Sequence, residues 1–269
     1  MLRLFDYCVS VTHDRFASDS DANRSCVTPP YQESLGPKKS APIYQNFWNF
    51  GQNRAEKSSM IFQSTWQTNT ASNLVELRKK IISENYSVDS FDSSKNLFPD
   101  TSIPSGVSII TGPQAKSVKH PVLDGYYISD EKSFSILKKI THRGKFNFHS
   151  ENKYMVIVGE SNGASLLNNR IISKPVIVTD ITKSPYANPQ ILYSSDTRND
   201  CVNAQRFWST KFVRFAIKQL KRGHHQPIKV FGFVPDVDQT KFTTDKELND
   251  KFNLTQEEIK YIDENISHF

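Results

Sequence analysis

The order of hydrophobic and polar positions predicts alternating helices and strands over the first part of the chain. Apolar side chains recur at helical spacing over residues 42–57 and again over residues 74–82, where three basic residues face outward. Short apolar runs at residues 60–62 and 106–110 are typical of buried strands. This order of loop, helix, strand, helix and strand over residues 28–112 predicts half of a doubly wound α/β sheet.

The pattern changes after Gly112-Pro113, where β-like runs alternate with loops rich in Asn, Ser and Gly. The predicted strands cover residues 126–128, 154–158, 175–178 and 229–234. We therefore expect an irregular arm at residues 1–27, a partial catalytic-type α/β domain at 28–115, and a mixed α+β domain at 116–269. Two capping boxes, Thr244/Glu247 and Thr255/Glu258, predict short helices near the C-terminus.

The strongest predicted helix spans residues 203–222, with Gly223 as its stop. Five cations fall within about 100° of one another on its surface by the 3.6-residue period; they are Lys211, Arg214, Lys218, Lys221 and Arg222. Such a row has two interpretations. It is either a solvated helix face or a surface that lies along a nucleic-acid backbone.

Composition narrows the choice of partner only slightly. The 269 residues carry a net charge of +6 with a pI near 9.1, which favours an acidic partner such as DNA but also fits a mildly basic protein. The three cysteines form no CxxC and no His stands at ligand spacing from them, so we expect no metal. Sparse cysteines, no apolar run of membrane-spanning length and no signal peptide predict a cytoplasmic protein without a membrane partner.

The stretch Thr28-Pro29-Pro30-Tyr31 is the clearest candidate for chemistry. Two prolines fix φ and remove two backbone donors, which leaves rigid carbonyl acceptors beside an aromatic ring. Such acceptors suit the exocyclic amine of a flat base, and the ring suits stacking on it. An ordinary Pro-Pro loop with a half-buried tyrosine remains the alternative at this point.

Several segments in order resemble the N6-adenine DNA methyltransferases of bacterial restriction–modification systems. The family's catalytic motif, Asn/Asp/Ser-Pro-Pro-Tyr/Phe, is matched by residues 28–31. The resemblance continues through Ser-Ala-Pro-Ile-Tyr at 40–44, Met-Ile-Phe-Gln-Ser-Thr-Trp at 60–66 and Leu-Phe-Pro at 97–99. It ends in Thr-Lys-Phe-Val-Arg-Phe at 210–215, Phe-Gly-Phe-Val-Pro-Asp at 231–236 and the two capping boxes.

This resemblance implies a Rossmann-like methyltransferase sheet followed by a target-recognition domain. It also implies that a flipped adenine is methylated by S-adenosylmethionine, with the Pro29 carbonyl accepting from the base amine and Tyr31 stacking on the ring. Thr28 and Pro30 complete the motif, double-stranded DNA is the implied partner, and the basic residues of the 203–222 helix would contact its phosphates.

Two departures from the family pattern shape the expected activity. Thr28 offers a hydroxyl, which is shorter than an Asn amide and has no carbonyl acceptor, and none of the ten glycines forms the GxG of a cofactor-binding turn. Only 27 residues precede the motif. We therefore expect that this chain does not bind S-adenosylmethionine alone. Either a second polypeptide carries the cofactor half, or the chain is an inactive relative that binds DNA or a partner and modulates a restriction–modification system.

A nuclease is the remaining alternative, prompted by Asp236, Asp238 and Lys241. The spacing of these residues does not fit the acid–x–Lys pattern of a metal nuclease, so the sequence favours the methyltransferase-derived interpretation.

Overall fold

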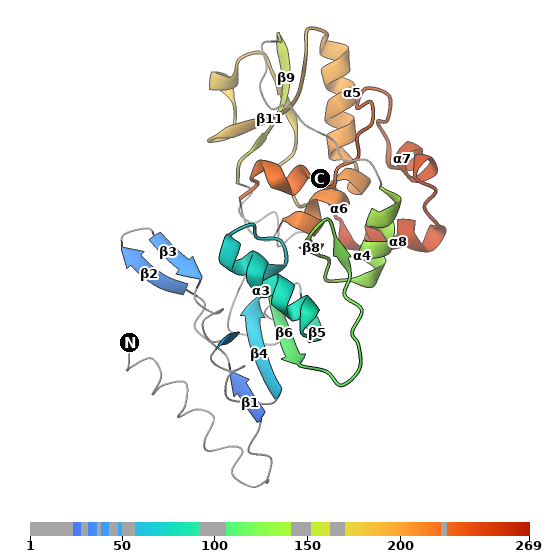
Figure 1. Ribbon diagram of the computed structural model, residues 1–269. Helices are drawn as coiled ribbons and strands as arrows, with labels where there is room; N and C mark the ends of the chain where they lie inside the picture. The colour runs from blue at the N-terminus through green and yellow to red at the C-terminus, as the bar shows by residue number, and fades with distance from the viewer. Residues whose placement is uncertain are drawn as a thin grey trace. The chain divides into compact units, whose positions relative to one another are not determined.

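The computed structural model has a mixed α/β fold and describes nine segments of the chain. They are residues 24–27, 32–36, 39–42, 48–49, 57–91, 106–140, 152–161, 170–221 and 225–269. The chain divides into two compact units (Figure 1), which we call the first unit (residues 1–129) and the second unit (residues 130–269). The sequence predicts a domain boundary at 115/116.

A four-stranded sheet organises the first unit, with the strand order β1-β4-β6-β5. Its strands are β1 (Arg24–Val27), β4 (Lys57–Gln63), β5 (Ser87–Phe91) and β6 (Val107–Gly112). β1 and β4 are parallel, and their register pairs Val27 with Met60. β6 is antiparallel to both β4 and β5, so β1, β4 and β5 all run in the same direction.

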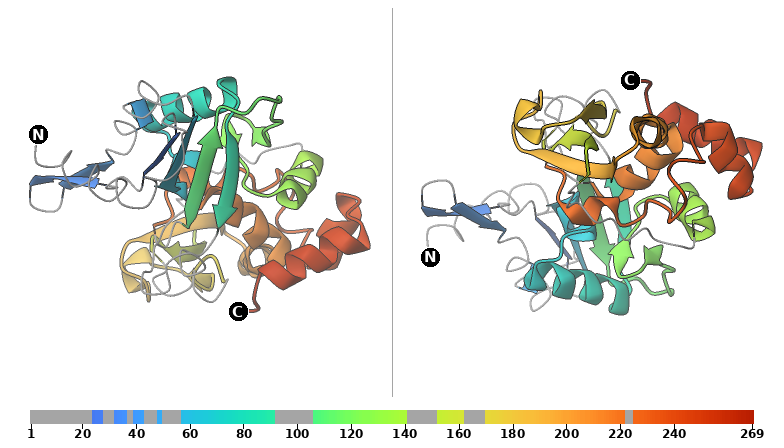
Figure 2. Two further views of the ribbon diagram at one scale, coloured as in Figure 1. Left: turned by 90° about the horizontal axis from the view of Figure 1, so that it is seen from below. Right: turned by 90° about the horizontal axis from the view of Figure 1, so that it is seen from above.

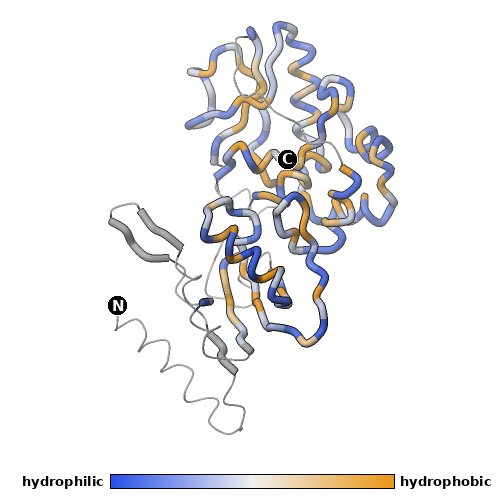
Figure 3. The backbone as a smooth tube through the Cα atoms, viewed as in Figure 1, coloured by the Kyte–Doolittle hydropathy of each residue, from blue (hydrophilic) through white to orange (hydrophobic). Residues whose placement is uncertain are grey.

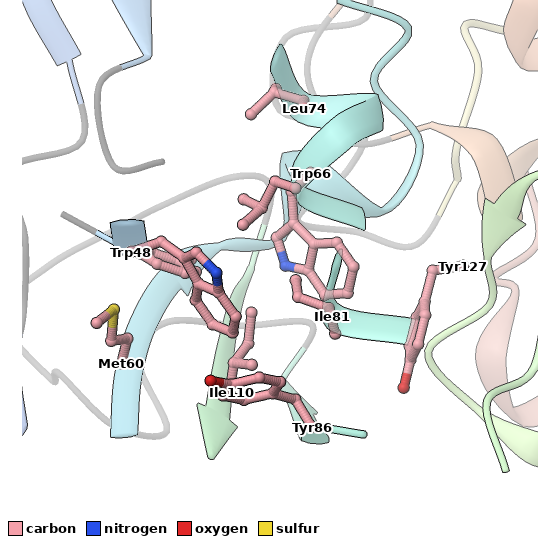
Figure 4. Packing of buried hydrophobic residues seen from close by; sticks show 10 residues of the cluster. Trp48, Met60, Trp66, Leu74, Ile81, Tyr86, Ile110 and Tyr127 are labelled. Atoms are coloured by element: carbon pink, nitrogen blue, oxygen red, sulfur yellow. The ribbon is translucent and has the colours of Figure 1, made fainter. Parts of the chain in front are cut away.

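Helix α3 (Ser72–Ser83) covers one face of this sheet (Figures 1 and 2), as its apolar positions require. Its buried residues Leu74, Leu77 and Ile81 recur at intervals of three and four and pack into one cluster with Met60 and Phe62 of β4. Aromatic rings fill the rest of this core (Figure 4). They belong to Trp48, Trp66, Tyr86 and Tyr127, and the rings of Trp48 and Tyr86 have centroids 4.4 Å apart.

Two hairpins complete the described part of the first unit. β2 (Gln32–Gly36) pairs with β3 (Lys39–Pro42), and β7 (Val122–Leu123) pairs with β8 (Tyr126–Tyr127). The second hairpin turns through Asp124 and Gly125, with φ angles of 50° and 78°. An Asp-Gly pair is well suited to this turn because both positions need the left-handed backbone.

A smaller sheet and five helices form the described part of the second unit. The antiparallel sheet has the order β10-β9-β11, from β9 (Tyr154–Gly159), β10 (Val176–Val178) and β11 (Pro189–Ser195), and α5 (Arg198–Ser209) packs on it. The other helices are α4 (Glu131–Lys139), α6 (Lys211–Leu220), α7 (Asp245–Lys251) and α8 (Gln256–Asn265). Hydrophobic and hydrophilic positions alternate along α5 and α6 (Figure 3), and the apolar ones form the core of the unit.

Both predicted capping boxes are confirmed. Thr244 and Glu247 close the start of α7, and Thr255 and Glu258 close the start of α8. The helix predicted over residues 203–222 is wrong as a single element, because it is two helices that meet at Thr210. The Thr210 hydroxyl accepts from the Val213 amide and so begins α6 as its N-cap.

Three further expectations need correction. Residues 24–27 form strand β1 rather than part of an irregular arm. Residues 87–91, for which the sequence pattern predicts no element, form strand β5. Residues 229–234, predicted as a strand, lie in the 3₁₀ helix η5 (Ile228–Phe231) and the turn after it. Of the helix predicted over 42–57, residues 48–49 are helical, Pro42 ends β3 and Lys57 begins β4. The strands predicted at 60–62, 106–110 and 154–158 and the helix at 74–82 are confirmed.

No helix within the part of the chain that the structure describes is both long and apolar enough to cross a bilayer.

Candidate functional site

The candidate site is the edge of the first unit's sheet where its parallel strands end. β4 ends at Gln63 and β5 at Phe91, level with the start of β6, because Val107 pairs with both residues. β1 runs in the same direction and ends at Val27, which pairs with Met60 and so stops short of that level. Open α/β sheets bind ligands outside the carboxyl ends of their strands. Thr28, Pro29, Pro30 and Tyr31 follow β1 directly in the chain, although these four residues lie outside the described residues.

Buried hydroxyl and amide groups gather at this edge. The Ser64 and Ser108 hydroxyls are 2.8 Å apart. The Gln67 side-chain amide donates to Ser90 Oγ at 2.7 Å and to Ser108 Oγ at 3.2 Å. These four side chains come from β5, β6 and the 3₁₀ helix η1 (Ser64–Gln67) that follows β4, so they tie together the ends of the central strands. We call them the edge network.

The edge network contains one acceptor that is not satisfied. Gln67 is fully buried, and its Oε1 has no hydrogen-bond partner within the described structure. An unpaired buried carbonyl oxygen costs about 1–3 kcal/mol. A donor that reached this oxygen would therefore be bound favourably.

The aromatic side chains next to this edge belong to the core. Trp66, in η1, is fully buried and its ring lies 5.0 Å from that of Tyr127. Arg78 of α3 donates to the Trp66 carbonyl at 2.6 Å and so connects η1 to α3. Trp66 and, in the second unit, Trp208 are thus packing residues rather than platforms for a base.

The predicted basic row on α6 is directed into the protein. Lys211 Nζ lies 2.7 Å from Asp263 Oδ1 of α8, and Lys218 Nζ lies 3.4 Å from Asn265 Oδ1. Arg214 Nη1 donates to the Ser267 carbonyl at 2.6 Å, and its guanidinium lies 4.3 Å from the centre of the Phe269 ring. The row therefore fastens α8 and the residues after it to α6.

Contact with phosphates needs exposed cations, but most of this row is buried. Lys211, Arg214 and Lys221 are only 9%, 1% and 3% exposed. Burial lowers the pKa of Arg214 to about 10 and that of Lys221 to about 7. Lys221 Nζ donates to the Ile171 carbonyl at 2.6 Å, and Arg222 lies outside the described residues. DNA contact by these residues stays a prediction. The exposed row of cations on which such contact depends is not found among the described residues.

The helical period shows why the sequence misleads here. It places Lys211, Arg214 and Lys218 on one side of α6, but it does not say that α8 and the residues after it cover that side. The edge network is the opposite case, because uncharged Ser and Gln residues far apart in the chain give little signal. The polar pair Gln63-Ser64 immediately after the apolar run 60–62 was the available hint.

The residues that prompted the nuclease alternative form a local surface turn. Lys241 Nζ lies 3.2 Å from Asp238 Oδ2, and the other oxygen of that carboxylate accepts from the Thr240 amide and hydroxyl. Among the described residues, no group of three or more His, Cys, Asp and Glu side chains is arranged to hold a metal ion.

Replacing Lys221 with methionine tests whether burial lowers the pKa of this lysine. Its pKa is lower in the folded chain than in the unfolded one, so between about pH 7 and pH 10 the unfolded state binds the proton and the folded state does not. The free energy of unfolding of the wild type therefore rises with pH across this window, relative to the variant. We expect Lys221→Met to be more stable at pH 7 by roughly 1–3 kcal/mol, a difference that shrinks by pH 9.

Urea denaturation at pH 6, 7.5 and 9 measures this effect, with Lys218→Met as a control on the same side of α6. Parallel pH profiles for the wild type and Lys221→Met would contradict the assignment of a strongly desolvated Lys221.

The sequence matches no protein-family model, and no curated protein matches it with significant similarity.

Proposed function

We propose that the chain is the base-holding part of an N6-adenine DNA methyltransferase, or of an inactive relative of such an enzyme. The observation that carries this proposal is the parallel pairing of β1 with β4. It makes the carboxyl end of β1, from which Thr28-Pro29-Pro30-Tyr31 continues, the ligand-binding edge of an α/β sheet.

The sheet supports the proposal in a second way. β4 and β5 run in the same direction and are connected through α3, which covers one face of the sheet. A strand–helix–strand crossover of this kind is the repeating unit of doubly wound sheets, and such sheets often carry an antiparallel strand as well. β6 takes that antiparallel place between β4 and β5.

In the proposed site, this chain binds and orients the base. The Pro29 carbonyl and the Thr28 hydroxyl accept from the exocyclic amine of a flipped adenine, while Tyr31 stacks on its ring and Pro30 keeps the segment rigid. The unpaired Gln67 Oε1 lies at the same sheet edge, where it is fully buried. Together these groups favour a base that carries an amine over one that carries a carbonyl at the same position.

The residues present do not fit the cofactor S-adenosylmethionine. A glycine-rich turn lets the backbone approach such a cofactor closely, yet β4 leads into Ser64-Thr65-Trp66-Gln67, three of whose side chains are buried. The chain also lacks a GxG. Methyl transfer therefore requires a cofactor-binding part that these residues do not supply, such as a second polypeptide. Without one, the chain is a binding protein that modulates a restriction–modification system.

Substitution of Tyr31 tests the base-holding role. We expect the wild type to bind a single-stranded oligonucleotide in which 2-aminopurine stands next to a target adenine, with a change in the fluorescence of the 2-aminopurine as the adenine leaves the stack. Tyr31→Ala should weaken binding by about 5- to 100-fold, because stacking on one aromatic ring contributes about 1–3 kcal/mol. Tyr31→Phe keeps the ring and should remain close to the wild type. DNA binding that is unaffected by Tyr31→Ala would show that the chain binds DNA elsewhere.

Calorimetry with S-adenosylmethionine tests whether this chain binds the cofactor alone. We expect no saturable heat from the purified chain, because its residues offer no cofactor turn. The enzyme form of the proposal then predicts N6-methyladenine, detected by mass spectrometry of the DNA, only when a cofactor-binding chain is added. One-site micromolar binding of S-adenosylmethionine by this chain alone would contradict the account.

A further inference from the structure

A second candidate site lies in the first unit, between α3 and the β7–β8 hairpin. A hollow of about 350 Å³ opens there, bordered by Val75, Arg78 and Lys79 of the helix and by Val122, Gly125 and Tyr126 of the hairpin. Its lining is mostly apolar, with two adjacent cations on the helix side. None of these residues belongs to the edge network or to the Thr28–Tyr31 motif.

Arg78 is the unusual member of this lining, because it is a nearly buried cation without an anionic partner. It is 5% exposed, and burial lowers its pKa. Nη1 donates to the Trp66 carbonyl at 2.6 Å and to the Asn69 carbonyl at 3.1 Å. The described residues include no carboxylate that forms an ion pair with Arg78.

The contacts of Arg78 leave part of its guanidinium for another group. An arginine side chain offers five N–H donors, and the two carbonyls engage only Nη1. The Tyr126 ring centre lies 6.0 Å from the guanidinium carbon, close enough for a weak cation–π attraction that does not neutralise the charge. A buried charge without a counter-ion is unfavourable, so an anion that reached Arg78 would be bound with an appreciable gain.

The rim of the hollow adds a second positive charge. Lys79 is exposed beside Arg78, and the acidic Asp124 stands in the turn of the hairpin. The three charged side chains that border the hollow, Arg78, Lys79 and Asp124, thus sum to +1. This balance favours an anionic ligand over a cationic one.

We propose that this hollow binds the phosphate of a nucleotide, with Arg78 and Lys79 on the phosphate and the ring of Tyr126 and the side chains of Val75 and Val122 beside the base or sugar. Arginine is suited to phosphate because its planar fork matches two phosphate oxygens. A free mononucleotide and a nucleotide within a nucleic-acid strand present the same group. The inference is independent of the proposed adenine pocket.

The test measures binding of thymidine 5′-monophosphate by calorimetry and of a fluorescein-labelled oligothymidine strand by anisotropy. Thymine probes avoid the proposed adenine pocket. Lys79→Glu and its neighbour Lys80→Glu form a matched pair, because both lysines are exposed on α3 but only Lys79 borders the hollow. We expect Lys79→Glu to weaken binding by about 3- to 10-fold and Lys80→Glu by less than about twofold.

Arg78→Gln keeps much of the side-chain length and two of the five N–H donors but removes the charge, and it should weaken binding by about tenfold or more. Circular dichroism checks that this variant is folded, and the Lys79/Lys80 pair keeps the test decisive if it is not.

Binding of the mononucleotide identifies a free nucleotide as sufficient, whereas binding of the strand alone identifies a nucleic acid. Absence of binding by both probes at millimolar concentration, or equal effects of Lys79→Glu and Lys80→Glu, would overturn the proposal. Tyr31→Ala should leave thymidine monophosphate binding unchanged, which separates this site from the adenine pocket.

Discussion

The parallel pairing of β1 with β4 is the constraint on which the first unit depends. A parallel pair cannot be closed by a tight turn, so the chain between Val27 and Lys57 must cross back from one end of the sheet to the other. The strand ends then collect at one edge, and the same logic applies from β4 through α3 to β5. The hydrophobic core on the α3 side fixes the sheet, and the edge network joins the strand ends above it. The proposed base-holding segment begins where this fixed edge ends.

The second unit uses positive charge in a different way. Its α6 cations pair with Asp263, Asn265 and carbonyl oxygens of the C-terminal residues, so they stabilise the packing of α8 on α6. This arrangement carries an energetic cost, because desolvated cations such as Lys221 need good hydrogen-bond geometry to be tolerated. Because Lys211, Arg214 and Lys221 are buried, they cannot also form an exposed surface for phosphates. If the chain contacts DNA, the contact must involve other parts of its surface or the residues outside those described.

Elements with strong local signals could be predicted from the sequence, and those that depend on distant partners could not. The α3 stripe, the apolar runs of β4, β6 and β9, and the two capping boxes carry their information within a few residues. β5 is mostly polar and is a strand because it pairs with β6, and η5 looks strand-like in composition but lies in a helical turn. At the site, the motif at residues 28–31 is readable, whereas Gln67 and its serine partners come together only through the sheet register.

The central proposal is that a base binds at the carboxyl edge of the β1-β4-β6-β5 sheet. Amide chemical-shift mapping by NMR during titration with an adenine-containing single-stranded oligonucleotide tests this most directly. The account predicts saturable shifts for the amides of Val27, Ser64, Gln67 and Ser108, which surround that edge. Shifts confined to the second unit or to the hollow beside Arg78, with the edge amides unchanged at saturation, would contradict it.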